Sequence, residues 1–183
     1  YTYTNGDEVE LFLNGKSLGL KKNSNDPKLR ARIKWDNIAY APGTLVAVAK
    51  KNGKVVDCHQ IETTGEAVAL KLVPDMETWH ADGKDLMHVR IYAVDKKGRR
   101  VLNVKDAKAF DKLTFTVKGD ANIVAVDNGN IASDELHIGK TQLEKSIQRN
   151  LFQGSALVIL RAGDKPGKIE LLVAGERSEE HTS

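Results

Sequence analysis

The sequence predicts an all-β protein built from β-sandwiches. Short segments in which apolar and polar side chains alternate recur along the 183 residues, and Gly, Pro, Asn or Asp residues separate them. Most of these segments are about 4–8 residues long, the usual length of a strand. Helical spacing of apolar residues is scarce. Together these features favour a sandwich over a helical or α/β fold.

The first strands along the chain are predicted to form hairpins. Residues 9–13 alternate and lead into Asn14-Gly15, while residues 45–49 and 55–56 flank Asn52-Gly53. An Asn-Gly pair between two apolar strands favours a type I′ turn, because both central residues of that turn need a positive φ. We therefore predict two tight hairpins in the first third of the chain.

The remaining strands are predicted from the same alternation. Residues 29–35 alternate so that Trp35 is expected to face the core. A further hairpin is expected around residues 95–98, between strands 89–94 and 101–104. The other predicted strands cover residues 68–73, 113–117, 123–126, 156–160 and 168–173.

One segment carries a helical spacing. Leu143, Ile147 and Leu151 lie four residues apart, which places them on one face of a helix with a slight drift. The spacing is equally compatible with a long polar excursion between strands, so both alternatives stay open for residues 141–151.

The chain is expected to hold two domains. One alternating run ends at Ile61 and a new one begins at Val68, so residues 1–65 and 66–176 are predicted to form two consecutive immunoglobulin-like β-sandwich domains. The first offers only about four to five strands where such a sandwich uses about seven, so we expect it to be truncated. The polar residues 177–183 are expected to be a non-native tail.

Composition excludes several classes of protein. With 28 Lys+Arg against 25 Asp+Glu, the net charge of +3 gives no basic footprint for nucleic acid. The 40% hydrophobic residues argue against disorder, and no apolar run approaches the ~20 residues of a membrane helix. Cys58 is the single cysteine, so no intramolecular disulfide can form. Its alternating neighbours predict a buried thiol.

Several segments in a fixed order resemble a known family. In the first domain they are residues 3–19, 40–49 and 52–56, and in the second they are residues 81–86, 94–98, 126–130 and 151–159. As an ordered set, they resemble the C-terminal immunoglobulin-like accessory domains of bacterial glycoside hydrolase family 2 enzymes, most like a β-galactosidase. The chain is thus expected to be a fragment of such an enzyme.

The resemblance implies a structural role beside a catalytic (β/α)₈ barrel. Enzymes of this family carry two catalytic glutamates on the barrel, and the resemblance implies a parent that hydrolyses terminal β-galactosides with retention. The family also includes mannosidases and glucuronidases. No residue here matches either glutamate, so no catalytic, cofactor-binding or metal-binding position is carried over, and no cofactor is expected. The expected partner is the parent's own barrel, and a periplasmic or secreted bacterial parent is expected. This chain alone is expected to be inactive.

Two other classes of protein remain as alternatives. Tandem immunoglobulin-like repeats of a surface adhesin would show self-similarity, but the Asn-Gly hairpins of the first domain have no counterparts at the same spacing in the second. A carbohydrate-binding module needs a row of exposed aromatic side chains, and aromatic residues make up only 5% of the chain.

Trp79 and Tyr92 form the sharpest candidate for a carbohydrate contact. Trp79 stands where the family usually has an aliphatic residue, and Tyr92 alternates onto the face opposite Val89 and Ile91. Exposed rings of this kind can stack on sugars. Partial burial against a neighbouring domain is the favoured alternative, because aromatic side chains dominate interfaces.

The other polar groupings are interpreted as ordinary surface chemistry. Acids on one strand face are expected to be solvated, acidic loops to cap their own backbone, and basic tips to be solvated turns. Histidines without metal-ligand spacing are expected at the surface. These groupings are Glu8 with Glu10, the loops 82–85 and 127–130, the hairpin tip 96–100, Asp134 with His137, and the histidines His59, His80, His88 and His181.

Overall fold

The computed structural model describes residues 1–103, 110, 112–138 and 144–175. The chain divides into two compact units, Tyr1–Thr63 and Thr64–Ser183, called here the first and second units. The described residues form strands and turns without any α-helix, which confirms the all-β prediction. Within this part of the chain there is accordingly no helix able to cross a membrane.

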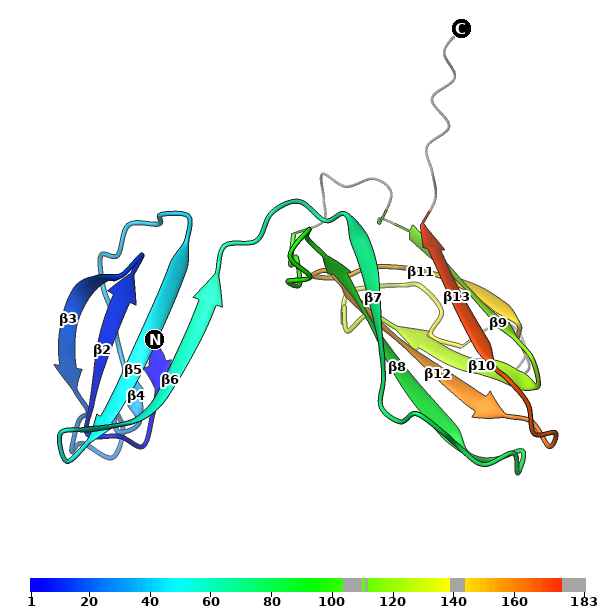
Figure 1. Cartoon of the computed structure of the whole chain (residues 1–183), viewed down its shortest axis with the longest axis horizontal. Helices are drawn as coiled ribbons and strands as arrows, with labels where there is room; N and C mark the ends of the chain where they lie inside the picture. The colour runs from blue at the N-terminus through cyan, green and yellow to red at the C-terminus, as the bar shows by residue number, and fades with distance from the viewer. Residues whose placement is uncertain (104–109, 111, 139–143, 176–183) are drawn as a thin grey trace, which may run out of the picture. The chain divides into compact units, whose positions relative to one another are not determined.

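The first unit is built on one antiparallel sheet of four strands. Its strands are β2 (Glu8–Leu13), β3 (Lys16–Lys22), β5 (Thr44–Lys51) and β6 (Lys54–Glu62), in the order β3-β2-β5-β6 (Figure 1). Two short strands, β1 (Thr2–Tyr3) and β4 (Arg32–Ile33), pair with each other separately.

Both Asn-Gly hairpins form as predicted. Asn14 and Gly15 have φ values of 50° and 79°, and Asn52 and Gly53 have values of 51° and 75°. These positive angles are what a type I′ turn requires of its two central residues. The hairpins fix the register in which β2 pairs with β3 and β5 pairs with β6.

The core of the first unit is small. Val9, Leu11 and Ile33 are the buried apolar side chains among its residues. The prediction of a strand over residues 29–35 is wrong except at β4, because a turn held by Asp26 occupies the preceding residues. Trp35 is half-buried rather than in the core, and its indole N–H donates to Thr2 Oγ1 at 3.1 Å.

Cys58 is exposed, which contradicts the expected buried thiol. It lies on β6, the edge strand of the sheet, and all nine residues of β6 are exposed. Alternation within a strand predicts a buried face only where a second layer covers that face. In the first unit no second layer covers either face of β6, so its side chains lie in solvent.

The second unit is a sandwich of two antiparallel sheets (Figure 1). The four-stranded sheet has the order β10-β12-β8-β7 and the three-stranded sheet has the order β11-β9-β13. The strands are β7 (Ala69–Pro74), β8 (Leu86–Val94), β9 (Lys112–Lys118), β10 (Ala121–Asp127), β11 (Ser146–Asn150), β12 (Ser155–Ala162) and β13 (Glu170–Gly175).

The core of the second unit lies between these sheets. Ile91 of β8 and Val158 of β12 come from the four-stranded sheet, and Leu113 and Phe115 of β9 come from the other, all with 0% exposure. Alternate residues on each strand point inward, so both sheets contribute one apolar face.

Two sequence predictions in this unit need correction. Residues 146–150 form β11, paired with β9, so the described part of the 141–151 segment is neither a helix nor a polar excursion; residues 141–143 lie outside the described residues. Residues 101–103 form no strand: the isolated bridge between Val94 and Arg100 precedes them, and residue 104 lies outside the described part.

Candidate functional site

The most prominent polar feature of the second unit is a buried arginine. Arg149 lies on β11, where Ile147 and Arg149 alternate inward and Gln148 and Asn150 point outward. Its side chain is 0% exposed. A buried guanidinium must be paired and hydrogen-bonded to be tolerated, because it cannot lose its proton.

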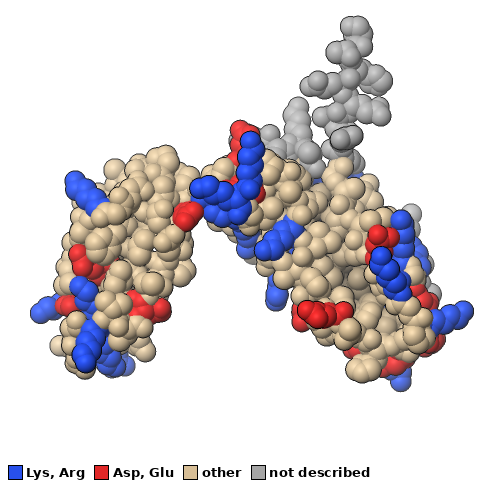
Figure 2. Space-filling model, viewed as in Figure 1, with Lys and Arg blue, Asp and Glu red and all other residues tan. Residues whose placement is uncertain are grey.

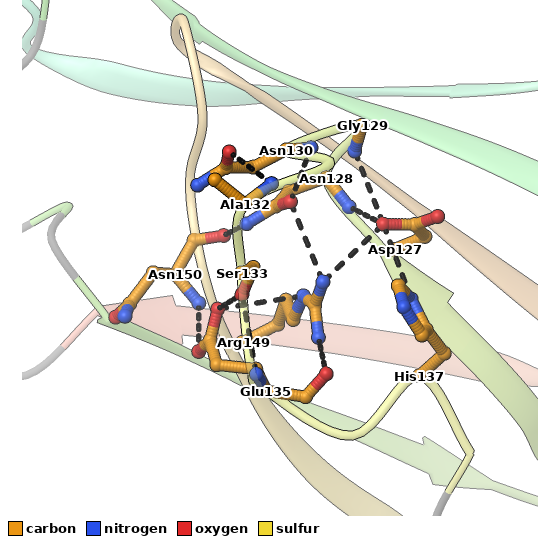
Figure 3. Close-up of polar contacts among 10 residues, drawn as sticks. All are labelled: Asp127, Asn128, Gly129, Asn130, Ala132, Ser133, Glu135, His137, Arg149 and Asn150. Carbon is orange, nitrogen blue, oxygen red and sulfur yellow. Dashed lines mark hydrogen bonds and ion pairs between the residues drawn. The ribbon is translucent and has the colours of Figure 1, made fainter.

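Arg149 is held by three residues of the β10 end and the following loop (Figure 3). Its Nη1 donates to the Glu135 carbonyl at 2.6 Å, and its Nη2 donates to Asp127 Oδ1 at 3.3 Å and Asn128 Oδ1 at 3.4 Å. Its Nε lies 3.5 Å from Glu135 Oε2 as an ion pair, without a hydrogen bond among the described residues. We call Asp127, Asn128, Glu135, His137 and Arg149 the Arg149 cluster.

The loop after β10 folds on its own side chains. Asp127 Oδ1 accepts the N–H of Gly129 at 3.1 Å, Asn128 Oδ1 accepts that of Asn130 at 2.9 Å, and Asn130 Oδ1 accepts that of Ala132 at 3.1 Å. These are successive Asx turns, the ordinary turn chemistry expected for residues 127–130. Figure 3 shows how they wrap the loop around the guanidinium of Arg149.

Asp127 stays ionised in this setting. The backbone N–H of Gly129, with that of Asn128 and the charges of His137 and Arg149, holds the pKa of the Asp127 carboxyl below its usual range, against the opposing effect of burial. His137 Nδ1 lies 3.3 Å from Asp127 Oδ1. The positive charge of Arg149 is thus balanced within the cluster.

The cluster has the chemistry of a structural clamp. A retaining glycosidase needs one carboxyl whose pKa is raised so that it can donate a proton, beside a second that is ionised. Among the described residues, every carboxyl with a resolved pKa shift has a lowered pKa, Asp127 included. The carboxyls of Asp127 and Glu135 lie 3.3 and 3.5 Å from nitrogens of Arg149, so both are paired with the buried guanidinium.

An open cleft of about 320 Å³ adjoins the cluster on the outer face of the four-stranded sheet. Its lining comes from β8, β10 and the loop after it, β12, and the hairpin tip after β8. The lining residues are Arg90, Tyr92, Arg100, Asp127, Asn128, Gly129, Ser155, Ala156 and Leu157. The guanidinium of Arg100 lies 5.1 Å from the ring centroid of Tyr92.

The structure places the two predicted carbohydrate contacts in different settings. Tyr92 lines the cleft and is half-buried. Trp79 packs against the core of the second unit and is not among the cleft residues. A carbohydrate contact shared by Trp79 and Tyr92 stays a prediction. Of the two residues, Tyr92 is the one that lines the cleft.

Sequence reasoning missed Arg149 and Arg100. Had residues 146–150 been interpreted as a strand, alternation with Ile147 would have placed Arg149 inside. Arg100 belongs to the basic tip that was expected to be solvated; it is exposed, and it also donates to the Gln153 carbonyl and to Ser155 Oγ, each at 3.0 Å. Arg99 in the same tip pairs with Asp95 at 2.7 Å, while Lys96 and Lys97 are exposed.

The remaining polar groupings have local partners. His80 lies 3.2 Å from Asp85 and His88 lies 3.0 Å from Asp75. Asp82 Oδ1 accepts the backbone N–H groups of residues 84 and 85, as a capped turn does. Within the described part of the chain, no group of three His, Cys, Asp or Glu side chains is arranged to hold a metal ion. His181 lies outside that part.

Glu10 likewise has partners on its own sheet, with Lys50 Nζ at 3.2 Å and Ser17 Oγ at 2.9 Å. Over the visible faces of both units, Figure 2 shows acidic and basic side chains interspersed. A face of mixed charge is the pattern expected of solvated strands.

Two family models cover most of the sequence. Residues 70–183 match glycoside hydrolase family 2 C-terminal domain 5, and residues 1–57 match a domain of unknown function, DUF4982. The chain belongs to the glycoside hydrolase family 2 C-terminal domain 5 family. This confirms the resemblance drawn from the ordered segments, and it makes the chain an accessory region of a family 2 enzyme.

Curated relatives and solved structures agree with this family. The chain is 37% identical over 174 residues to the β-galactosidase BoGH2A of Bacteroides ovatus. The matched region covers 95% of this chain and 19% of that protein. It is 31% identical over 176 residues to a putative β-glucuronidase of Formosa agariphila, covering 95% of this chain and 16% of that protein. The chain therefore spans about a fifth or less of the length of these relatives.

Among solved structures, a glycosyl hydrolase family 2 member from Bacteroides cellulosilyticus matches with a TM-score of 0.76 and 31% identity, covering 94% of this chain and 23% of that one. A β-glycosidase from Bacteroides vulgatus matches with a TM-score of 0.76 and 27% identity, covering 93% of this chain and 20% of that one. These matches agree with the immunoglobulin-like sandwich fold.

Proposed function

We propose that this chain is the non-catalytic part of a β-galactosidase that hydrolyses terminal β-linked galactosides. The observation that carries the proposal is the 37% identity over 95% of the chain to a region that makes up 19% of a β-galactosidase. The rest of such an enzyme leaves ample length for a catalytic barrel. Relatives named as β-glucuronidases, at 31% identity, make a glucuronide-cleaving parent the second candidate.

In this proposal the two units pack on the catalytic barrel of the same parent. The first unit supports such packing through its edge strand β6, where Val55, Val56 and Ile61 are 63%, 53% and 55% exposed. Three large apolar side chains on one open strand are typical of a surface that another part of the protein covers.

The Arg149 cluster supports the non-catalytic assignment. The Asp127 carboxyl pairs with Arg149 and accepts the N–H of Gly129, and the Glu135 carboxyl pairs with Arg149 and accepts the N–H of Asn150. Both acids are thus engaged in holding the loop. The two carboxylates of a retaining mechanism are therefore assigned to the parent's barrel.

The test is to express the full-length parent and this chain separately, and to assay both with nitrophenyl β-galactoside and β-glucuronide. We expect hydrolysis of the galactoside by the parent and none by the chain. Preferential cleavage of the glucuronide would favour the second candidate. Hydrolysis by the chain alone, or a parent with neither activity, would contradict the proposal; a parent made only of further sandwich repeats would favour an adhesin.

A further inference from the structure

The cleft beside the Arg149 cluster lies on the solvent side of the four-stranded sheet. Ile91 of β8 and Val158 of β12 point into the core, so Arg90, Tyr92 and Leu157 project from the opposite face. The cleft is therefore a feature of the second unit alone. Its volume of about 320 Å³ falls at the lower end of the ~300–1,000 Å³ range of small-ligand sites.

Two arginines give the cleft an excess of positive charge. Arg90 is exposed and forms no hydrogen bond or ion pair with the residues that the structure describes. Arg100 uses one nitrogen, Nη2, for both of its hydrogen bonds, which leaves donor capacity on the other two nitrogens. Its guanidinium carbon lies 5.1 Å from the centroid of the Tyr92 ring, within the range of a cation–π contact.

The single acid of the cleft does not cancel this charge. Asp127 Oδ1 accepts from Arg149, Asn128 and Gly129, and it lies 3.3 Å from His137 Nδ1. The negative charge of Asp127 is thus already compensated from inside the sandwich. Figure 3 shows the other oxygen of this carboxylate directed away from Arg149, where it can accept hydrogen bonds.

Groups suited to hydroxyls and to a ring complete the lining. The Ser155 hydroxyl and the second oxygen of Asp127 can hydrogen-bond to a polyhydroxylated molecule. Leu157 and the Tyr92 ring offer apolar surface for C–H groups. The cleft thus combines the guanidinium of Arg90, which is unpaired among the described residues, with a carboxylate that can bind hydroxyls and a small apolar surface. This combination matches a sugar that carries a carboxylate.

We propose that this cleft binds an acidic saccharide, a uronic acid residue, independently of any catalytic barrel. Arg90 and Arg100 bind the carboxylate of the sugar, and Asp127 and Ser155 bind its hydroxyls. This inference goes beyond the proposed function, because it assigns to the second unit a binding site for a sugar that the parent enzyme does not have to cleave.

The test is titration of the full 183-residue chain with sodium glucuronate and sodium galacturonate, followed by NMR of the backbone amides. We expect saturable shifts at Tyr92, Gly129 and Ser155, and none at Gly15 in the first unit. Glucose and galactose provide the sugar ring without the carboxylate, and sodium acetate provides the carboxylate without the ring. Each should bind at least about tenfold more weakly, since either half of the contact is missing.

Arg90→Gln is the decisive variant, because Arg90 has no partner among the described residues whose loss would disturb the fold. We expect it to weaken binding about tenfold, the effect of losing one charge-assisted hydrogen bond. Arg161→Gln is the matched control, because Arg161 lies on β12 outside the cleft lining. This variant should bind the uronates with the same affinity as the unaltered chain.

Three results would overturn the proposal. They are no saturable shifts with either uronate, equal affinity for the neutral sugars, or equal weakening by Arg90→Gln and Arg161→Gln. The last result would reveal a general attraction of anions to the surface in place of a site.

Discussion

The two units of the chain bury very different amounts of apolar side chain. Among the described residues of the first unit, Val9, Leu11 and Ile33 are the buried apolar side chains, whereas the second unit has a continuous core that includes Ile91 and Phe115. The difference follows from layering. The second unit packs two broad sheets face to face, while the sheet of the first unit is accompanied only by a two-stranded pair.

The lesson is that strand pairing alone does not make a stable domain. A sheet gains most of its stability when a second layer covers its apolar face. We therefore expect the second unit to provide most of the free energy of unfolding of this chain. The first unit is expected to unfold more easily, and to depend on whatever covers its exposed apolar residues in the parent.

The largest expected effect comes from removing the central ring of the better-packed core. Phe115→Ala should lower the free energy of unfolding of the second unit by about 3–5 kcal/mol, because it deletes a fully buried side chain and leaves a cavity. Urea unfolding can be followed in single-tryptophan variants, since Trp35 reports on the first unit and Trp79 on the second. Only the Trp79 transition should shift; an equal shift of both would show that the units unfold together.

The next effect concerns the buried charge that the second unit has and the first lacks. Arg149→Met should cost about 2–3 kcal/mol, because it removes hydrogen bonds from a buried charged group and releases the loop after β10. The same urea measurement on the Trp79 transition tests it. Lys118→Met, at an exposed ion pair with Glu170, is the control and should change stability by less than about 1 kcal/mol.

A matched pair of glycines compares the turns of the two units. Gly154 and Gly53 both have positive φ, at 67° and 75°. A Cβ at Gly154 would lie 1.8 Å from the Val101 carbonyl oxygen, whereas one at Gly53 would meet nothing within 4 Å. Gly154→Ala should therefore cost about 2 kcal/mol and Gly53→Ala about 1 kcal/mol. Equal costs in thermal unfolding would contradict the close approach at Gly154.

The smallest effect is a dependence on pH that comes from one carboxyl of the second unit. The Arg99 guanidinium, with the backbone N–H groups of Gly65, Arg99 and Lys97, holds the pKa of the Asp95 carboxyl well below its usual range. A lowered folded pKa contributes stability above the unfolded pKa of about 3.9, and this stability is lost as the pH falls toward the folded pKa.

As the pH falls from 5 to about 2, the free energy of unfolding followed by Trp79 should thus decrease more in the unaltered chain than in Asp95→Asn. The variant has no titratable group at this position. The comparison uses the difference between the two proteins at each pH, so that other acids cancel. A difference that stays constant across this range would show that Asp95 does not contribute to the pH dependence.

Much of the local structure could be predicted from the sequence. Asn14-Gly15 and Asn52-Gly53 specify their turns because few residues accept a positive φ at both positions. Alternation located β2, β5, β8, β9, β10 and β12, because a strand that faces a core must alternate. The ordered segments also pointed to the correct family, since turn residues and core residues are spaced by the fold itself.

What only the tertiary structure decided is which faces are covered and which strands become neighbours. Residues 146–150 form a strand because β9 offers them an open edge. This pairing directs the side chain of Arg149 to the interior of the sandwich. Cys58 remained exposed because nothing in the first unit covers β6. The cleft at Tyr92 joins residues from three strands and a hairpin tip, a proximity set by long-range pairing that local spacing does not encode.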